Sequence, residues 1–207
     1  MPDYQFEEEF HAVGLRPVAG IDEAGRGPLA GPVTAAAVVL PEGFAWEGLD
    51  DSKKLTARKR EALHSRLLSD PAVHTACVHV EPNEIDRIDI LRATWRAMRL
   101  AFARLPIEAA AALIDGRSVE GFPAPYRAVV KGDSRSLSIA AASVIAKVER
   151  DRIMDRYERE FPGYGFGTHK GYGTIKHREA LLRLGPCPIH RRSFAPVARV
   201  ENARRGT

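Results

Sequence analysis

The amino-acid sequence predicts an α/β protein built on a mixed β-sheet. Short β-branched or small apolar runs alternate with helical patterns, and glycine or proline interrupts the chain after several of these segments. The first two runs flank a glycine-rich turn and are expected to be antiparallel neighbours. Because strand patterns occur both before and between the helical patterns, the natural class is a mixed sheet flanked by helices.

The first half of the chain contains three strand patterns and two helical patterns. The strands are expected at VAGI (18–21), PVTAAAVVL (32–40) and VHTACVHV (73–80). Thr56 can cap a helix over residues 57–68. A second helix is expected where five large apolar residues recur at helical spacing and would form one buried face. These residues are Leu91, Trp95, Met98, Phe102 and Leu105.

The second half continues with two strands and two helices. AALID (111–115) is a short strand ended by Gly116, and YRAVVKGD (126–133) is a strand that breaks into a loop at Gly132. A long helix follows over residues 136–160, and Thr174 caps the last regular helix, which stops before Gly185. We expect one domain over residues 1–161 and a small helical C-terminal appendage over 162–207.

Composition excludes several classes of protein. A chain of 207 residues with 44% hydrophobic and 28% charged residues is typical of globular proteins. No apolar run approaches the roughly 20 residues of a membrane helix, and the acidic N-terminus does not resemble a signal peptide. Two cysteines are too few for a disulfide framework. We therefore expect a cytoplasmic protein that does not bind membranes, and nothing in the sequence demands more than a monomer.

The charge pattern permits a polyanionic partner without demanding one. The net charge is only +4, but basic residues gather in DSKKLTARKR, THKGYGTIKHR, HRR and ARRGT. Each cluster is either a solvated face or a surface that contacts phosphates. Lys53, in the first cluster, is open to both interpretations.

Acidic residues follow three of the predicted strands. Asp22, Asp115 and Asp133 each end or just follow an apolar run beside a residue that breaks the strand. Such strand ends line a common crevice in open α/β sheets, so these side chains are expected to converge. Glu23 can join Asp22 in one site if the strand ends or twists there. Taken singly, each carboxylate is also explained as a turn former or helix cap.

Crowded, buried carboxylates need a counter-charge, because they repel one another and lose hydration. A hard divalent cation supplies it, and oxygen-only ligands select Mg²⁺ or Mn²⁺ over Zn²⁺. Two such ions can activate a water and stabilise the leaving oxygen in a displacement at phosphorus. Asp22 is the candidate bridging ligand.

The turn GRGPLAGP is a poor match to a nucleotide-binding loop. It lacks the GK[ST] sequence, its glycine spacing is GxGxxxG, and its prolines obstruct the helix that would bind phosphate. Gly25 and Gly27 can instead bring main-chain groups close to a sugar or phosphate, and Arg26 can add a charged donor.

The segment FPGYGFGTHKGYG mixes aromatic, glycine and basic residues, as a surface that stacks on a sugar or base does. Tyr164 and Phe166 are better explained as packing residues. Tyr172 lies between two glycines just before a helix, where it can project freely. His169, His177, Cys187 and His190 match no usual zinc-finger spacing, so a zinc site is not expected.

Together these segments resemble the ribonuclease HII family, the bacterial type 2 ribonucleases H. The resemblance covers about residues 18–194 through GIDEAGRGPLAGPV, DSKKL, LIDG, VVKGD, SIAAASVIAKVERDR, YGFGTHKGYGT and HRRSF, in that order. It implies a ribonuclease H-like fold with a small helical C-terminal part. It also implies four acidic metal-site and catalytic residues, which by motif are Asp22, Glu23, Asp115 and Asp133.

The implied activity is a Mg²⁺- or Mn²⁺-dependent endonuclease. It hydrolyses RNA in RNA/DNA hybrids and cuts duplex DNA 5′ to embedded ribonucleotides, leaving 3′-hydroxyl and 5′-phosphate ends, in ribonucleotide excision and RNA primer removal. By the same resemblance the turn of Gly25, Arg26 and Gly27 contacts the 2′-hydroxyl, Tyr172 stacks on the sugar, and Lys53 contacts a phosphate. The alternative from another class is a nucleic-acid-binding protein without enzymatic activity, whose binding is salt-sensitive and indifferent to metal.

Overall fold

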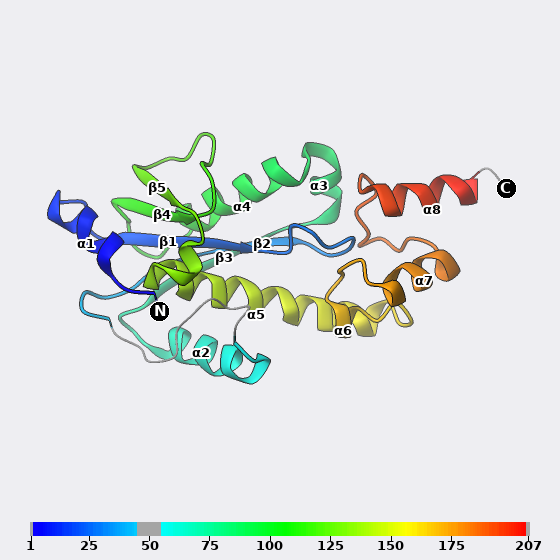
Figure 1. The fold of residues 1–207 in the computed structure, drawn as a ribbon, viewed down its shortest axis with the longest axis horizontal. Coiled ribbons are helices and arrows are strands. Elements are labelled where there is room, and N and C mark those ends of the chain that lie inside the picture. The colour runs from blue at the N-terminus through cyan, green and yellow to red at the C-terminus, as the bar shows by residue number, and fades with distance from the viewer. Residues whose placement is uncertain (1, 45–54, 206–207) are drawn as a thin grey trace.

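The computed structural model describes residues 2–44 and 55–205 of the chain. These residues form a five-stranded sheet with helices on both faces and further helices beyond one end of the sheet (Figure 1). The α/β class and the mixed sheet expected from the sequence are confirmed. Lys53 and the rest of the DSK motif lie outside the described residues.

The sheet has the strand order β3-β2-β1-β4-β5. The strands are β1 (Val18–Ala24), β2 (Val33–Val39), β3 (His74–Val80), β4 (Ala111–Asp115) and β5 (Tyr126–Val129). Strand β2 runs antiparallel to both β1 and β3, whereas β4 runs parallel to both β1 and β5. The central strand β1 therefore ends at the same edge as β4 and β5, which is the edge where the predicted carboxylates follow their strands.

The helices and a short 3₁₀ turn complete the described part of the chain. They are α1 (Gln5–Ala12), α2 (Ala57–Ser69), α3 (Pro82–Ile88), α4 (Ile90–Ala103), the 3₁₀ turn Gly132–Ser134, α5 (Leu137–Glu160), α6 (Phe166–His169), α7 (Ile175–Leu184) and α8 (Ala195–Arg205). Helices α2 and α5 cover one face of the sheet, and α3 and α4 cover the other (Figure 1). No helix among these residues is both long and apolar enough to cross a bilayer.

Helix α5 lies unusually close to the central strand. It begins after Ser136, whose hydroxyl accepts a hydrogen bond from the N–H of Ile139 as an N-cap. A Cβ at Gly20 of β1 would collide with the backbone of Ser138, so only glycine permits this approach. The close packing brings the inner face of α5 directly against the strand that carries Asp22.

The predicted buried face of α4 is partly wrong. Leu91 is 43% exposed, and Trp95 and Phe102 are half-buried. Small residues, namely Ala93, Thr94, Ala97 and Ala101, make up the buried face together with Met98. Small side chains let the helix lie close to the sheet, so the larger ones are displaced to its flanks. Leu105 lies beyond the end of the helix and is half-buried.

The expectation that the helix after Thr174 is the last regular one is also wrong, because α8 follows it. Helices α1 and α3 were not predicted either. The C-terminal helices α6, α7 and α8 lie beyond the sheet at the far end of α5 (Figure 1). Tyr164 and Phe166 are buried in the cluster that joins this segment to α5, as the sequence predicts.

Candidate active site

Asp22 and Glu23 lie near the end of the central strand, and their environments differ. Asp22 is 4% exposed, and its Oδ1 accepts a hydrogen bond from the N–H of Glu23 at 2.7 Å. The hydroxyl of Ser143 on α5 also hydrogen-bonds to the Asp22 carboxylate. The Glu23 side chain is more open to solvent and faces Arg26 Nη1, 3.5 Å from its Oε1. Of these two adjacent acids, only Asp22 is therefore buried.

Asp115 is the last residue of β4 and joins the same group. Its Oδ1 accepts a hydrogen bond from the N–H of Gly132 at 2.7 Å, which ties the end of β4 to the loop that carries Asp133. Asp133 lies in the 3₁₀ turn just before α5 and is 5% exposed. The fold thus places all four predicted carboxylates on strand ends or turns at one edge of the sheet.

The electrostatics show that three of these carboxylates converge. Burial raises the pKa of Asp22 well above its ordinary value, and the negative charges of Glu23 and Asp115 raise it further. Across the described residues, no three His, Cys, Asp or Glu side chains already have the spacing of a metal site. Repulsion between like charges favours such separation. The donor set consists only of carboxylate oxygens and carries excess negative charge, so it fits a hard divalent cation.

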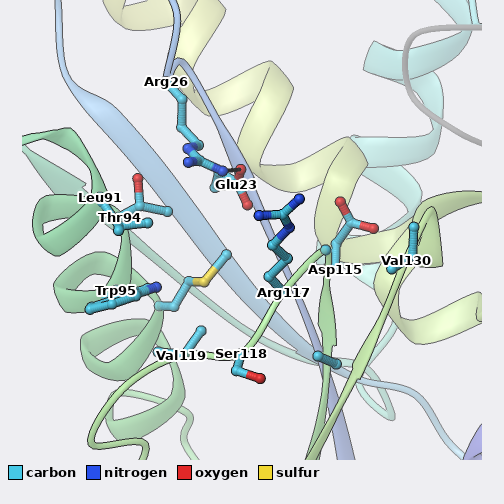
Figure 2. Close-up of a pocket in the computed structure, with 13 residues that line it drawn as sticks. Glu23, Arg26, Leu91, Thr94, Trp95, Asp115, Arg117, Ser118, Val119 and Val130 are labelled. Carbon is cyan, nitrogen blue, oxygen red and sulfur yellow. Dashed lines mark hydrogen bonds and ion pairs between the residues drawn. The ribbon is translucent and has the colours of Figure 1, made fainter.

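A pocket of about 1010 Å³ opens beside these carboxylates. Glu23, Arg26 and Asp115 line one side, and Figure 2 shows the guanidinium of Arg117 lying between Glu23 and Asp115. Leu91 and Trp95 of α4 form part of the opposite, apolar wall. Two of the side chains that depart from the predicted buried face of α4, Leu91 and Trp95, thus line the pocket.

The glycine-rich turn lies next to Tyr172. Gly25 has φ of +92°, and a Cβ there would overlap the side chain of Arg150, so both conformation and space require glycine. A Cβ at Gly27 would lie 3.8 Å from Cε1 of Tyr172, which is 46% exposed. The turn and the tyrosine therefore form one surface although they are far apart in sequence.

The histidines of the C-terminal segment form a hydrogen-bonded chain. His177 Nδ1 donates to the carbonyl of Tyr172 at 2.9 Å, and His177 Nε2 accepts from His190 Nε2 at 3.1 Å. His190 Nδ1 accepts from the N–H of Cys187 at 3.0 Å. Burial lowers the pKa of His177 and of His190 to about 4, so both are neutral at pH 7. This chain supports the backbone at Tyr172.

Four functional candidates were missed by sequence reasoning. They are Arg117, Ser143, Arg150 and Arg191. Arg117 could have been found, because it comes two residues after Asp115 at a predicted strand end. Nothing in the sequence distinguishes buried Arg191 from its exposed neighbour Arg192. The buried positions of Ser143 and Arg150 are visible only once α5 is docked on β1.

Residues 19–197 match the sequence model of the family described as ribonuclease HII. The chain belongs to the ribonuclease HII family. Membership confirms the expected enzyme class, an endonuclease that hydrolyses RNA in RNA/DNA hybrids and takes part in ribonucleotide removal. The alternative of a binding protein without enzymatic activity is thereby excluded.

Individual relatives agree with the family. The ribonuclease HII of Sinorhizobium fredii is 53% identical over 197 residues, which cover 95% of this chain and 84% of the relative. The crystal structure of ribonuclease H2 from Pyrococcus horikoshii superposes with a TM-score of 0.78 at 28% identity, covering 92% of this chain and 99% of that one. Bst ribonuclease HIII in complex with Mn²⁺ shares the fold, with a TM-score of 0.71 at 18% identity and coverage of 92% and 70%.

Proposed function

We propose that Asp22, Glu23, Asp115 and Asp133 are the catalytic and metal-binding residues of this ribonuclease. The observation that carries the proposal is the convergence of Asp22, Glu23 and Asp115 at one sheet edge, where burial and mutual repulsion raise the pKa of Asp22. The Mn²⁺ bound by the related Bst ribonuclease HIII supports a divalent cation here. We propose Mg²⁺ or Mn²⁺ in a two-ion site.

Each carboxylate has a distinct task in this proposal. Asp22, whose carboxylate is held by Ser143 and by the backbone of Glu23, would be the ligand shared by the cations. Asp115 and Asp133, tied together through Gly132, contribute from the neighbouring strand and turn. When bound, the cations would activate a water and stabilise the leaving oxygen. The products are a 3′-hydroxyl and a 5′-phosphate.

Recognition of the ribose is assigned to the turn and the tyrosine. Main-chain groups of Gly25, Arg26 and Gly27 contact the 2′-hydroxyl, the group that distinguishes RNA from DNA at a given sugar. The exposed ring of Tyr172, beside Gly27, stacks on that sugar. Through this recognition the enzyme cuts duplex DNA 5′ to an embedded ribonucleotide. Arg117, which lines the pocket, is proposed as a phosphate contact, and Lys53, outside the described residues, is proposed as a further one.

The assembly of the site supports three further parts of the proposal. Residues 1–161 form the catalytic domain, and residues 162–207 form a substrate-binding appendage that presents Tyr172. The carboxylates, the turn and Tyr172 all come from one chain, which supports action as a monomer. The composition supports a cytoplasmic enzyme.

Replacing Asp115 by asparagine tests the metal site. Asparagine keeps the oxygen that accepts from Gly132 but removes the charge, so cleavage of a hybrid and of a duplex with one ribonucleotide should fall at least about a hundredfold. Calorimetric titration should show weaker Mn²⁺ binding, and circular dichroism should show an intact fold. Asp70→Asn is the matched control, because Asp70 follows α2 and its side chain accepts a local hydrogen bond from the N–H of Ala72. Full activity of Asp115→Asn would overturn the assignment.

A further inference from the structure

Two buried arginines lie behind the glycine-rich turn. Arg150, on α5, is 1% exposed, and Arg191, between α7 and α8, is fully buried. Within the described residues, every hydrogen bond from both guanidinium groups goes to a main-chain carbonyl. Buried charges are normally paired with opposite charges, so this arrangement calls for a reason beyond packing.

Arg191 holds the two carbonyl groups at the tip of the turn. Its Nη2 donates to the carbonyl of Gly25 at 2.5 Å, and its Nη1 donates to the carbonyl of Arg26 at 2.9 Å. Its Nε donates to the carbonyl of Gly31 at 2.9 Å, where the turn returns to β2. One planar guanidinium thus binds both ends of the turn, which the single ammonium group of a lysine cannot do.

Arg150 holds the other half of the turn and connects it to the C-terminal segment. Its Nε and Nη2 donate to the carbonyls of Pro32 and Ala30 at 3.0 and 3.2 Å. Its Nη1 donates to the carbonyl of Lys170 at 3.0 Å. Burial lowers the pKa of Arg150, and burial together with the charge of Arg150 lowers that of Arg191 to about 9. Burying both guanidinium groups in their charged form is therefore electrostatically unfavourable.

Main-chain hydrogen bonds also connect the turn to the segment that carries Tyr172. The N–H of Leu29 donates to the carbonyl of Gly171 at 2.8 Å, directly before Tyr172. The N–H of Gly31 donates to the carbonyl of Ile189 at 2.9 Å. The turn and the segment that carries Tyr172 are therefore joined through side-chain and main-chain bonds alike.

The direction of the carbonyl groups determines what the turn presents outward. In a planar trans peptide the C=O and the following N–H point in opposite directions. The inward carbonyl of Gly25 therefore aims the N–H of Arg26 away from the core, and the inward carbonyl of Arg26 does the same for Gly27. Within the described part of the chain, neither N–H group donates a hydrogen bond. Two donors are left for a ligand.

We propose that Arg191 is a positioning residue for ribose recognition. By holding two carbonyl groups inward, it aims the N–H groups of Arg26 and Gly27 at the 2′-hydroxyl of the substrate. Arg150 holds the same turn and, through its hydrogen bond to Lys170, fixes the position of the turn relative to Tyr172. This inference rests on the proposed role of the turn and adds to it the residues that set the direction of its donors.

The test compares two substrates of the same sequence, a duplex with one ribonucleotide and an RNA/DNA hybrid. The first offers a single 2′-hydroxyl, so a misaligned turn must miss it, whereas the hybrid offers one at every position of the RNA strand. Arg191→Lys should lower the ratio of kcat/KM for the single ribonucleotide to that for the hybrid by about tenfold or more. Tyr172→Ala should lower the same ratio.

A second measurement separates positioning from loss of stability. In Arg191→Lys, the amide hydrogens of Leu29 and Gly31 should exchange faster, because the turn loses hydrogen bonds from the Arg191 guanidinium group. Leu67→Ala is the control: it opens a cavity in the core beneath α2, away from the turn, and should lower stability while leaving the ratio unchanged. If Arg191→Lys does not fold, Arg150→Lys replaces it with the same expectations.

The outcomes are distinct. If Arg191→Lys or Arg150→Lys lowers stability but leaves the substrate ratio and the exchange of the turn unchanged, the arginines are structural only and the inference is wrong. If the wild-type protein cuts hybrids but does not cut at single ribonucleotides, the proposed role of the turn is wrong, and the inference that depends on it is wrong as well. A reduced ratio with unchanged Mn²⁺ binding supports both.

Discussion

At the scale of single residues, the two adjacent acids of β1 differ most in their environment. Asp22 is enclosed between the strand and α5, whereas Glu23 faces the pocket and Arg26. Enclosure lets Ser143 orient the Asp22 carboxylate but removes the water that would stabilise its charge. The buried charge of Asp22 therefore favours cation binding and lowers the stability of the metal-free protein.

Asp22→Asn should therefore stabilise the metal-free protein. The amide keeps the size and an oxygen for hydrogen bonding but removes one of the repelling charges, a gain of about 1 kcal/mol or roughly 2 to 4 °C in Tm. Thermal unfolding in EDTA measures this gain. The same variant should lose most of the Tm increase that Mn²⁺ gives the wild type, whereas Asp70→Asn should retain it. An Asp22→Asn protein that is no more stable in EDTA would contradict the proposed crowding of charges.

The positions of the acids follow from the sequence, whereas the buried arginines do not, for a physical reason. Each acid lies near the end of a strand or in the turn after it, so local pattern and sheet topology together locate it. Arg150 and Arg191 act on a turn more than 100 residues earlier in the chain, through hydrogen bonds whose sequence separations are 118 to 166 residues except for the bond to Lys170. Arginines that bind backbone carbonyls need no complementary residue type, so the sequence carries no partner signal for them.

At the scale of elements, the contact between β1 and α5 organises the site. The missing side chain at Gly20 lets the backbone of Ser138 approach the strand, and Ser143 then reaches Asp22. The obstacle to a larger residue is main chain on a long helix, not a flexible side chain that could move aside.

Gly20→Ala should consequently be severely destabilising. The added methyl group must push α5 from the sheet, at a cost of about 3 kcal/mol or more. Chemical denaturation measures the loss, and the remaining folded protein should cleave more slowly because Ser143 is displaced from Asp22. Gly167→Ala, in α6, is the matched control, since a Cβ there meets only ordinary contacts, the shortest at 3.4 Å. Equal stability of the two variants would show that α5 adjusts without penalty.

Element boundaries followed from the sequence more reliably than buried faces. The predicted caps Thr56 and Thr174 begin α2 and α7, and each accepts the expected hydrogen bond from an N–H in the first turn. Capping is local and is therefore visible in the sequence. The face that α4 buries depends on how closely it approaches the sheet, which is why alanines displace Leu91 and Trp95 from the predicted core.

At the scale of the whole molecule, the histidine chain connects the C-terminal segment to the backbone of Tyr172. In the folded protein His177 and His190 stay neutral down to about pH 4, whereas in the unfolded chain they gain protons near pH 6.5. Protons therefore bind preferentially to the unfolded state between these values, and stability falls as the pH is lowered.

The free energy of unfolding should decrease between pH 6.5 and about pH 4 by on the order of 2 kcal/mol per histidine. Urea denaturation at a series of pH values measures this decrease. His177→Gln can donate and accept hydrogen bonds as the neutral imidazole does but does not titrate, so its stability should depend less on pH. A wild type whose stability is flat across this window would show that the two histidines are not held neutral.

The fold class and the order of the central elements could be predicted from periodicity and breakers, but the periphery could not. Helix α8 is rich in arginine and has no clear apolar face from which it could be predicted, and α1 is polar over most of its length. These helices are defined by tertiary contacts, among them the buried Val197 and Phe6. The division at residue 162 stays a prediction.

The straight course of α5 has a consequence for the nucleic acid that the enzyme handles. Ser143 and Arg150 are seven residues apart, or about two helical turns, and so lie on one face of the same rigid rod. Ser143 hydrogen-bonds to Asp22, and Arg150 holds the glycine-rich turn. If Asp22 binds the catalytic cations and the turn binds the ribose, as proposed, the helix fixes the distance between the two, so recognition of the sugar determines which phosphodiester is cut.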